Sequence, residues 1–370
     1  MSNLLKDRYN EAFVDGFLPA LQQVLPDLKQ ERLYALVFDE NWGAKELKDR
    51  MAHLADVLHQ LFETHYPTGV GQLIAFGQAL LDEGVDLNTF EFMFLPAYIE
   101  QYGQDHFEAS AEAMTFFGQH TSCEFAVRPF YLQYPEAMLS LTKVWAEHEQ
   151  INLRRQASEG CRPRLPWAMA LPFLKKDPSP ILPILDMLKA DPAEYVRRSV
   201  ANNLNDISKD HPEVAMDLAR AWKGHTKVTD WVVKHGLRTL LKQGHTEALR
   251  MHGFGSPEDL KVSEFRIQTP EVSIGEDLHF SFSLHNQSSS ASLVRLEYGL
   301  YFLKANGKQS RKVFKISERA YEADEKAQIE RKQPFKIIST RVLYPGPHAL
   351  SLIVNGEEGE SLPFDLVSHA

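Results

Sequence analysis

Apolar residues recur at helical spacing from the N-terminus to about residue 250, and short breaks marked by proline or glycine interrupt them. In three places, one amphipathic segment follows another after only a few residues. The first segments of these pairs are 136–149, 179–191 and 211–225. The pattern predicts helical hairpins, each of which buries its apolar face against its neighbours.

The three hairpins share a register. Their first helices end at Trp145, Leu188 and Trp222, which are 43 and 34 residues apart. Eight to ten residues later, the second helices carry Leu153-Arg154-Arg155, Val196-Arg197-Arg198 and Asp230-Trp231-Val232. Steps of this size are typical of HEAT-like repeats, whose stacks curve around an extended concave binding surface.

One connection departs from the repeat. Residues 162–183 contain six prolines, so they cannot form one regular helix. This places Trp167 on an irregular segment between two repeats, and long loops inside compact stacks are often functional.

After about residue 255, apolar and polar residues alternate between turn-forming sequences. The alternating segments are 261–268, 277–286, 292–303, 310–317, 326–333, 348–355 and 361–367. About seven short strands suggest an immunoglobulin-like β-sandwich. We therefore expect an α-then-β protein with a HEAT-like helical solenoid over 1–250, a linker over 251–259 and a β-sandwich over 260–370.

Composition changes this picture little. The chain is 44% hydrophobic and 24% charged, which is ordinary for a soluble globular protein. Its N-terminus is too polar for a signal peptide, and no apolar run approaches the ~20 residues that cross a bilayer. Two cysteines, Cys123 and Cys161, fit a cytoplasmic protein. Because no CxxC or HExxH occurs, we expect neither a structural zinc site nor a zincin site.

Charge is more informative because it is unevenly spread. Residues 1–149 hold 9 Lys and Arg against 23 Asp and Glu, whereas residues 150–245 hold 16 against 10. A basic middle suggests a polyanionic partner, with chance variation as the alternative. The sandwich has basic stretches at 303–319 and 331–341, for which a solvated strand face is the alternative. The first stretch contributes the candidate DNA contacts Lys308, Arg311, Lys312 and Lys315.

The helix predicted at 194–210, EYVRRSVANNLNDISKD, has arginines early and Asp206 late, an order that opposes the helix dipole. If second helices line the concave face, their paired arginines face one ligand and offer planar contacts to phosphates. These arginines are Arg154, Arg155, Arg197 and Arg198. Asp206 shares the helix face with Arg197, and a carboxylate there suits a target that is itself cationic.

Three long stretches resemble the AlkC branch of the AlkC/AlkD-type DNA glycosylases: SCEFAVRPFY (122–131), NLRRQASEGCRPRLPW (152–167) and EYVRRSVANNLNDISKDHPE (194–213). The sandwich resembles the domain appended to some AlkC proteins. The resemblance implies excision of N3-alkylated bases, such as 3-methyladenine and possibly 3-methylcytosine, without base flipping, a metal or a cofactor. It places Asp206 as the catalytic carboxylate, and Glu124, Glu159 and Trp167 around the lesion.

The chemistry suits these residue types. A cationic alkylated base is a good leaving group, and cleavage passes through an oxocarbenium-like sugar. A fixed carboxylate stabilises that cation and orients water, while further carboxylates and a tryptophan face attract the charged base.

Each residue also has a purely structural interpretation. Glu124 follows Thr121 by three residues, which is the spacing of a capping box. Glu159 is otherwise a solvated helix end, Trp167 a plug between repeats, and Asp206 an ion-pair partner of an arginine or Lys209. The competing functions are a non-catalytic HEAT–Ig adaptor for DNA or protein, and a relative that binds DNA but has lost hydrolysis. We expect a monofunctional glycosylase that acts as a monomer on alkylated double-stranded DNA, with no membrane partner.

Overall fold

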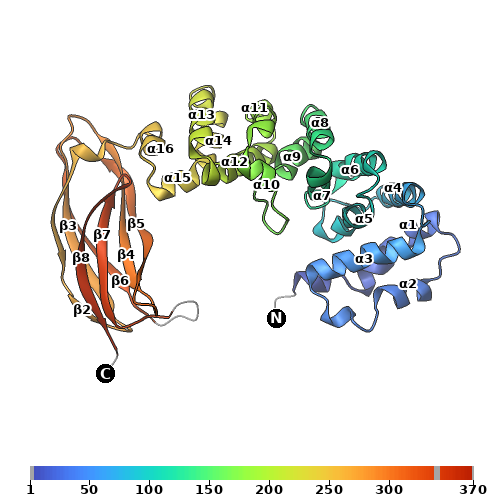
Figure 1. The fold of residues 1–370 in the computed structure, drawn as a ribbon, viewed down its shortest axis with the longest axis horizontal. Helices are drawn as coiled ribbons and strands as arrows, with labels where there is room; N and C mark the ends of the chain where they lie inside the picture. The colour runs from blue at the N-terminus through green and yellow to red at the C-terminus, as the bar shows by residue number, and fades with distance from the viewer. Residues whose placement is uncertain (1–3, 337–341, 369–370) are drawn as a thin grey trace. The chain divides into compact units, whose positions relative to one another are not determined.

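The computed structural model describes residues 4–336 and 342–368 and contains two compact units, which divide between Leu237 and Arg238. The first unit is helical and the second is rich in strands, as expected (Figure 1). In the described residues, no helix is both long and apolar enough to cross a membrane.

The helical unit contains α1–α14. Their bounds are α1 Glu11–Val24, α2 Gln30–Val37, α3 Leu47–Leu61, α4 Tyr66–Asp82, α5 Phe94–Tyr102, α6 Phe107–His120, α7 Val127–Gln133, α8 Pro135–Ala146, α9 Ile151–Gly160, α10 Pro172–Lys176, α11 Leu182–Leu188, α12 Glu194–Asp210, α13 Pro212–Trp222 and α14 Lys227–Gly236.

The three predicted hairpins are α8–α9, α11–α12 and α13–α14. Trp145, Leu188 and Trp222, which end the first helices, are all buried. The second helices pack side by side, with α12 between α9 and α14. Figure 1 shows α8, α11 and α13 along the opposite edge of this layer. The register of the apolar residues therefore predicts which helices become neighbours.

The repeated arginine closes the hairpin loop in two of these repeats. Arg154 Nη1 donates to the carbonyls of His148 and Glu149 at 3.0 and 2.7 Å. Arg197 Nη1 likewise donates to two carbonyls, those of Asp191 and Pro192, at 2.6 and 2.8 Å. In both repeats the two carbonyls lie six and five residues before the arginine. Nη1 of both arginines is therefore engaged in closing the loop, and contact of Arg154 and Arg197 with phosphates stays a prediction.

Arg197 and its neighbour should therefore control different properties. Arg197→Ala removes two hydrogen bonds from a charged donor and should lower the free energy of unfolding by about 1–3 kcal/mol. The Arg198 side chain is 61% exposed and pairs with an equally exposed Glu194, so Arg198→Ala should leave stability within about 0.5 kcal/mol. Urea denaturation of both variants checks this, and equal losses of stability would contradict it.

The second unit begins with two short helices, α15 Arg238–Gln243 and α16 Thr246–Met251. Its strands are β1 Leu260–Ile267, β2 Glu271–Ser273, β3 Asp277–Asn286, β4 Ser292–Leu303, β5 Gln309–Tyr321, β6 Lys326–Pro334, β7 Gly346–Val354 and β8 Glu357–Val367. Seven correspond to the predicted strands, and β2 is an additional short one.

The strands form two sheets, in the orders β1-β3-β6 and β2-β8-β7-β4-β5. Apolar side chains from both sheets form a single core, which includes Phe280, Leu300 and Leu350. Part of the expected linker packs against this domain, because Gly255 N donates to Leu293 O at 3.0 Å and Asn355 Nδ2 donates to Gly255 O at 2.7 Å. Residues 238–259 all belong to the second compact unit, together with the sandwich.

Candidate active site

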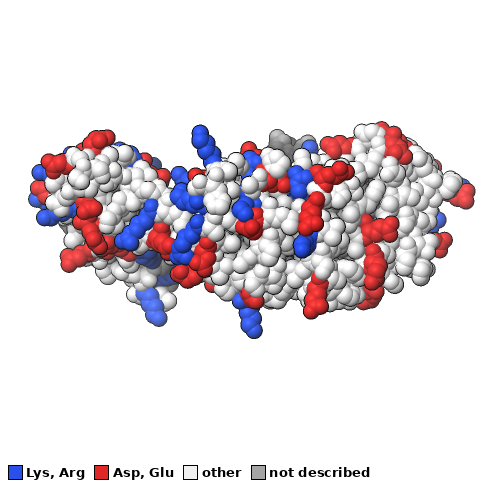
Figure 2. All heavy atoms as spheres, turned by 90° about the horizontal axis from the view of Figure 1, so that it is seen from above, with Lys and Arg blue, Asp and Glu red and all other residues white. Residues whose placement is uncertain are grey.

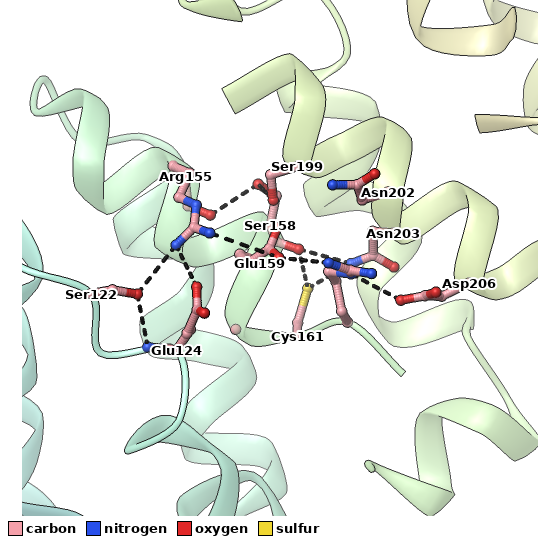
Figure 3. A network of polar contacts seen from close by, with 12 residues as sticks. Ser122, Glu124, Arg155, Ser158, Glu159, Cys161, Ser199, Asn202, Asn203 and Asp206 are labelled. Atoms are coloured by element: carbon pink, nitrogen blue, oxygen red, sulfur yellow. Dashed lines mark hydrogen bonds and ion pairs between the residues drawn. The ribbon is translucent and has the colours of Figure 1, made fainter. Parts of the chain in front are cut away.

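Six charged side chains of alternating sign form a continuous chain in the helical unit. In order they are Glu124, Arg155, Glu159, Arg162, Asp206 and Lys209. Figure 3 labels Glu124, Arg155, Glu159 and Asp206 among them. The five successive N–O distances are 2.7, 3.7, 2.6, 2.9 and 3.0 Å. Three carboxylates that are far apart in the sequence are therefore linked through two shared guanidinium groups.

Asp206 is the most enclosed member of this chain. Its residue is 1% exposed, although it lies on a polar helix. Arg162 Nε donates to one carboxylate oxygen and Lys209 Nζ to the other. The carboxylate is thus fixed from two sides, which orients it without burying an unpaired charge.

The two arginines keep their charge in this site. Burial opposes the charged form of Arg162, but Glu159 and Asp206 outweigh it and raise the pKa of Arg162. Burial likewise opposes the charge of Arg155, and the nearby Glu159 and Glu124 raise its pKa. Both guanidinium groups therefore stay charged despite their burial.

The asparagines of α12 explain the rest of this helix's unusual composition. Asn203 Nδ2 donates to Ser158 O at 2.9 Å and lies 3.3 Å from Cys161 Sγ. Asn202 Oδ1 lies 3.3 Å from His235 Nε2 on α14. These residues are poor helix formers but connect α12 to α9 and α14, so tertiary contacts offset their low propensity.

A buried arginine holds the segment between α9 and α10. Arg128 Nη1 donates to Gly160 O and Arg162 O at 2.8 and 2.7 Å, and its Nε and Nη2 donate to Met169 O at 2.9 and 2.7 Å. Burial lowers the pKa of Arg128 to about 10. Arg128 therefore fixes the backbone that carries Arg162 and Trp167.

Trp167 projects from this segment. The residue is 74% exposed and has a φ of 64°, the left-handed region that only strong surroundings impose on a non-glycine residue. Its exposure contradicts the interpretation of Trp167 as a plug between repeats. Lys48 of α3 donates to the Trp167 carbonyl and lies 4.3 Å from the centre of the Phe125 ring. The indole ring is thus presented to solvent by an anchored backbone.

Removing this anchor should loosen the segment. Lys48→Met keeps the length of the side chain but loses the charge-assisted hydrogen bond, so amide hydrogen exchange over residues 163–170 should accelerate about tenfold or more. Lys45→Met is the matched control, because Lys45 binds Asp39 instead. Exchange that is equally fast in both variants would show that Lys48 does not hold Trp167.

The surroundings of the three carboxylates show which of their purely structural interpretations apply. Thr121 is the C-cap of α6, and α7 starts only at Val127, so Glu124 is not part of a capping box. Glu159 is buried rather than solvated. Asp206 does pair with Arg162 and with Lys209, and this pairing coexists with a place in the candidate site.

The predicted contacts in the sandwich lie on or beside β5, an edge strand of the five-stranded sheet. All four side chains are exposed. Arg311 pairs with Glu358 at 2.7 Å and Lys315 with Glu318 at 2.9 Å. Lys312 Nζ lies 5.2 Å from the centre of the Phe314 ring, and Lys308 follows the turn before β5. In the second basic stretch, residues 337–341 lie outside the described residues.

Sequence reasoning missed three cations of the site. Arg162 bridges Glu159 and Asp206, Arg128 fixes the segment, and Lys48 anchors Trp167 from a distant helix. All three lie in the proline-rich connection or bind its backbone. Such contacts follow no helical period, so the spacing of apolar residues does not reveal them. Figure 2 shows acidic side chains over the N-terminal helices, whereas Lys and Arg are more frequent toward the C-terminal end of the helical unit.

Comparisons with known proteins agree with this architecture. Residues 261–368 match a family described as the C-terminal Ig-like domain of uncharacterised protein YhaZ. Uncharacterized protein YhaZ of Bacillus subtilis is 40% identical over 362 residues, covering 98% of this chain and 99% of that protein. The Pseudomonas fluorescens alkylpurine DNA glycosylase AlkC, bound to DNA containing an abasic site analog, superposes with a TM-score of 0.83 at 33% identity. That alignment covers 99% of this chain and all of the other.

Proposed function

The chain belongs to the AlkC family, and we propose that it is a DNA glycosylase that hydrolyses the N-glycosidic bond of cationic N3-alkylated bases such as 3-methyladenine. The observation that carries this proposal is the buried, doubly held carboxylate of Asp206, linked through arginines to Glu159 and Glu124. We include 3-methylcytosine as a second substrate because it carries the same positive charge.

In the proposed reaction, the bond between C1′ and the base breaks, and its electron pair leaves with the base. This electron pair neutralises the base and leaves positive charge on the sugar. Asp206 stabilises that charge and orients a water molecule, whose oxygen bonds to C1′ while its proton passes to the carboxylate and then to solvent. Because the base departs as a neutral molecule, no general acid is required.

The same residues favour a cationic base over a neutral one. Glu124 and Glu159 lie in the same charge chain, and Trp167 presents an exposed ring for a cation–π contact. The exposed Trp167 ring also suits a mechanism that leaves the base stacked in the duplex. Arg154, Arg155, Arg197 and Arg198 stay the candidate phosphate contacts on the second helices, and Arg198 has the most exposed side chain of those that form ion pairs.

One assay separates the glycosylase from the two competing functions. The protein is incubated with methylated duplex DNA, and free methylated bases are separated and quantified. Release of 3-methyladenine supports the glycosylase. Salt-sensitive DNA binding without release identifies an inactive relative, and neither binding nor release identifies a protein adaptor. Analytical ultracentrifugation of the same sample tests our further proposal that the active species is a monomer.

A further inference from the structure

The third hairpin departs from the first two at the position where they carry an arginine. Counted from the N-cap residues of the second helices, Asp230 takes the position of Arg154 and Arg197, and Trp231 takes the position of Arg155 and Arg198. Here the loop is closed in another way: Thr226 and Thr229 form a capping box, and Asp230 accepts a hydrogen bond from Gly224 N at 2.7 Å. By contrast, the N-caps of α9 and α12 make no side-chain hydrogen bond. Trp231 is therefore not needed to close its loop.

Trp231 forms a supported aromatic surface instead. The residue is 38% exposed, and its ring stacks on His235, with centroids 5.1 Å apart and an interplanar angle of 5°. His235 in turn contacts Asn202 of α12. Lys227 and Lys234 lie on the same helix face, at helical spacing from Trp231, and are exposed. We call Lys227, Trp231, Lys234 and His235 the α14 patch.

Packing and charge pairing leave the α14 patch unexplained. Trp231 leaves 38% of its surface exposed beyond its stacking on His235, and no acidic partner of Lys227 or Lys234 is found among the described residues. Two cations beside a flat ring complement a chain of phosphates and sugars better than they complement an apolar protein surface. The patch is also close to the candidate site, since Asn202 precedes Asp206 by four residues, about 6 Å of helix rise.

We propose that the α14 patch is a DNA-backbone contact that extends the binding face one repeat beyond the candidate active site. Lys227 and Lys234 bind phosphates, and the stacked Trp231 and His235 rings pack against the deoxyribose between them. The contact is independent of base sequence. This inference rests on the proposed function, because it needs DNA as the ligand, but it assigns residues that take no part in bond cleavage.

The salt dependence of DNA binding distinguishes a specific contact at the α14 patch from the general effect of positive charge on the protein. The Lys227→Gln/Lys234→Gln variant is compared with Lys143→Gln/Lys189→Gln, which removes the same charge from α8 and the end of α11. Dissociation constants for a duplex with an abasic-site analogue are measured from low to high salt. The α14 variant should reduce the slope of log affinity against log salt by about two, while the control keeps the wild-type slope. Trp231→Ala should weaken binding about tenfold, and Trp231→Phe less.

The outcomes distinguish this inference from the proposed function. If the wild-type protein binds DNA and releases base but the two lysine variants have the same salt slope, the α14 patch is not a DNA contact and the glycosylase proposal stands. If the wild-type protein neither binds DNA nor releases base, both fail. Circular dichroism confirms folding, and the lysine pair tests the patch even if Trp231→Ala is unstable.

Discussion

Replacing Asp206 with Asn should reduce the rate of release of 3-methyladenine by two orders of magnitude or more, because one preorganised charge opposite the developing sugar cation is lost. Asparagine has nearly the same shape and still accepts a hydrogen bond from Arg162 Nε. The effect should therefore appear in the single-turnover rate constant and not in affinity for an abasic-site analogue.

The fold should tolerate this change. After the substitution, Arg162 keeps its partner Glu159 at 2.6 Å, and the Lys209 side chain, which is 38% exposed, turns to water. Asp210→Asn is the matched control, since Asp210 ends the same helix and pairs with Arg164 outside the charge chain. Single-turnover assays and thermal melts of both variants check the prediction. An Asp206→Asn enzyme within about threefold of wild type would remove this carboxylate from the mechanism.

The helical hairpins were predictable because apolar spacing and helix-ending residues are local properties of the chain. The role of each arginine was not. Arg197 and Arg198 are adjacent in sequence but point in directions about 100° apart on a helix, and only tertiary packing decides which one faces the loop. The repeat register was therefore correct in pairing Arg154 with Arg197, but it placed the third hairpin one residue out of step and could not assign either arginine to loop closure.

The candidate site was only partly visible in the sequence. The resemblance selected Asp206, Glu159 and Glu124, and the structure links all three in one charge chain. Arg162 escaped notice because its partners lie 3 and 44 residues away and it follows no period. The exposure of Trp167 likewise depends on its left-handed backbone and on Arg128, neither of which a propensity reveals.

The β-sandwich has a role in DNA binding that can be tested. If the base is not flipped, distortion of the duplex must bring C1′ to the carboxylate, and bending a site costs roughly 1–6 kcal/mol by elastic estimates. Contacts from a second domain offset that cost. We propose that the exposed cations of β5 and the turn before it supply them, so that the sandwich helps to clamp the DNA.

Residues 1–237 should therefore fold alone but lose much of their DNA affinity and base-release activity. We choose this end point instead of the expected boundary at 250 because residues 238–250 group with the sandwich and Leu237 is the last residue of the helical unit. Folding is checked by circular dichroism, affinity by titration with an abasic-site duplex, and activity by release of methylated base.

A charge variant of the intact protein distinguishes the loss of DNA contacts from other effects of removing a whole domain. Full-length protein with Lys308, Arg311, Lys312 and Lys315 changed to Gln should reproduce part of the loss and flatten the salt dependence. Lys261→Gln/Lys326→Gln, on the three-stranded sheet, should have little effect. The competing role is a sandwich that aids solubility or recruits another protein. A folded 1–237 fragment with full affinity and activity would establish that role, because the helical unit would then hold and distort the duplex without the contacts that the clamp requires.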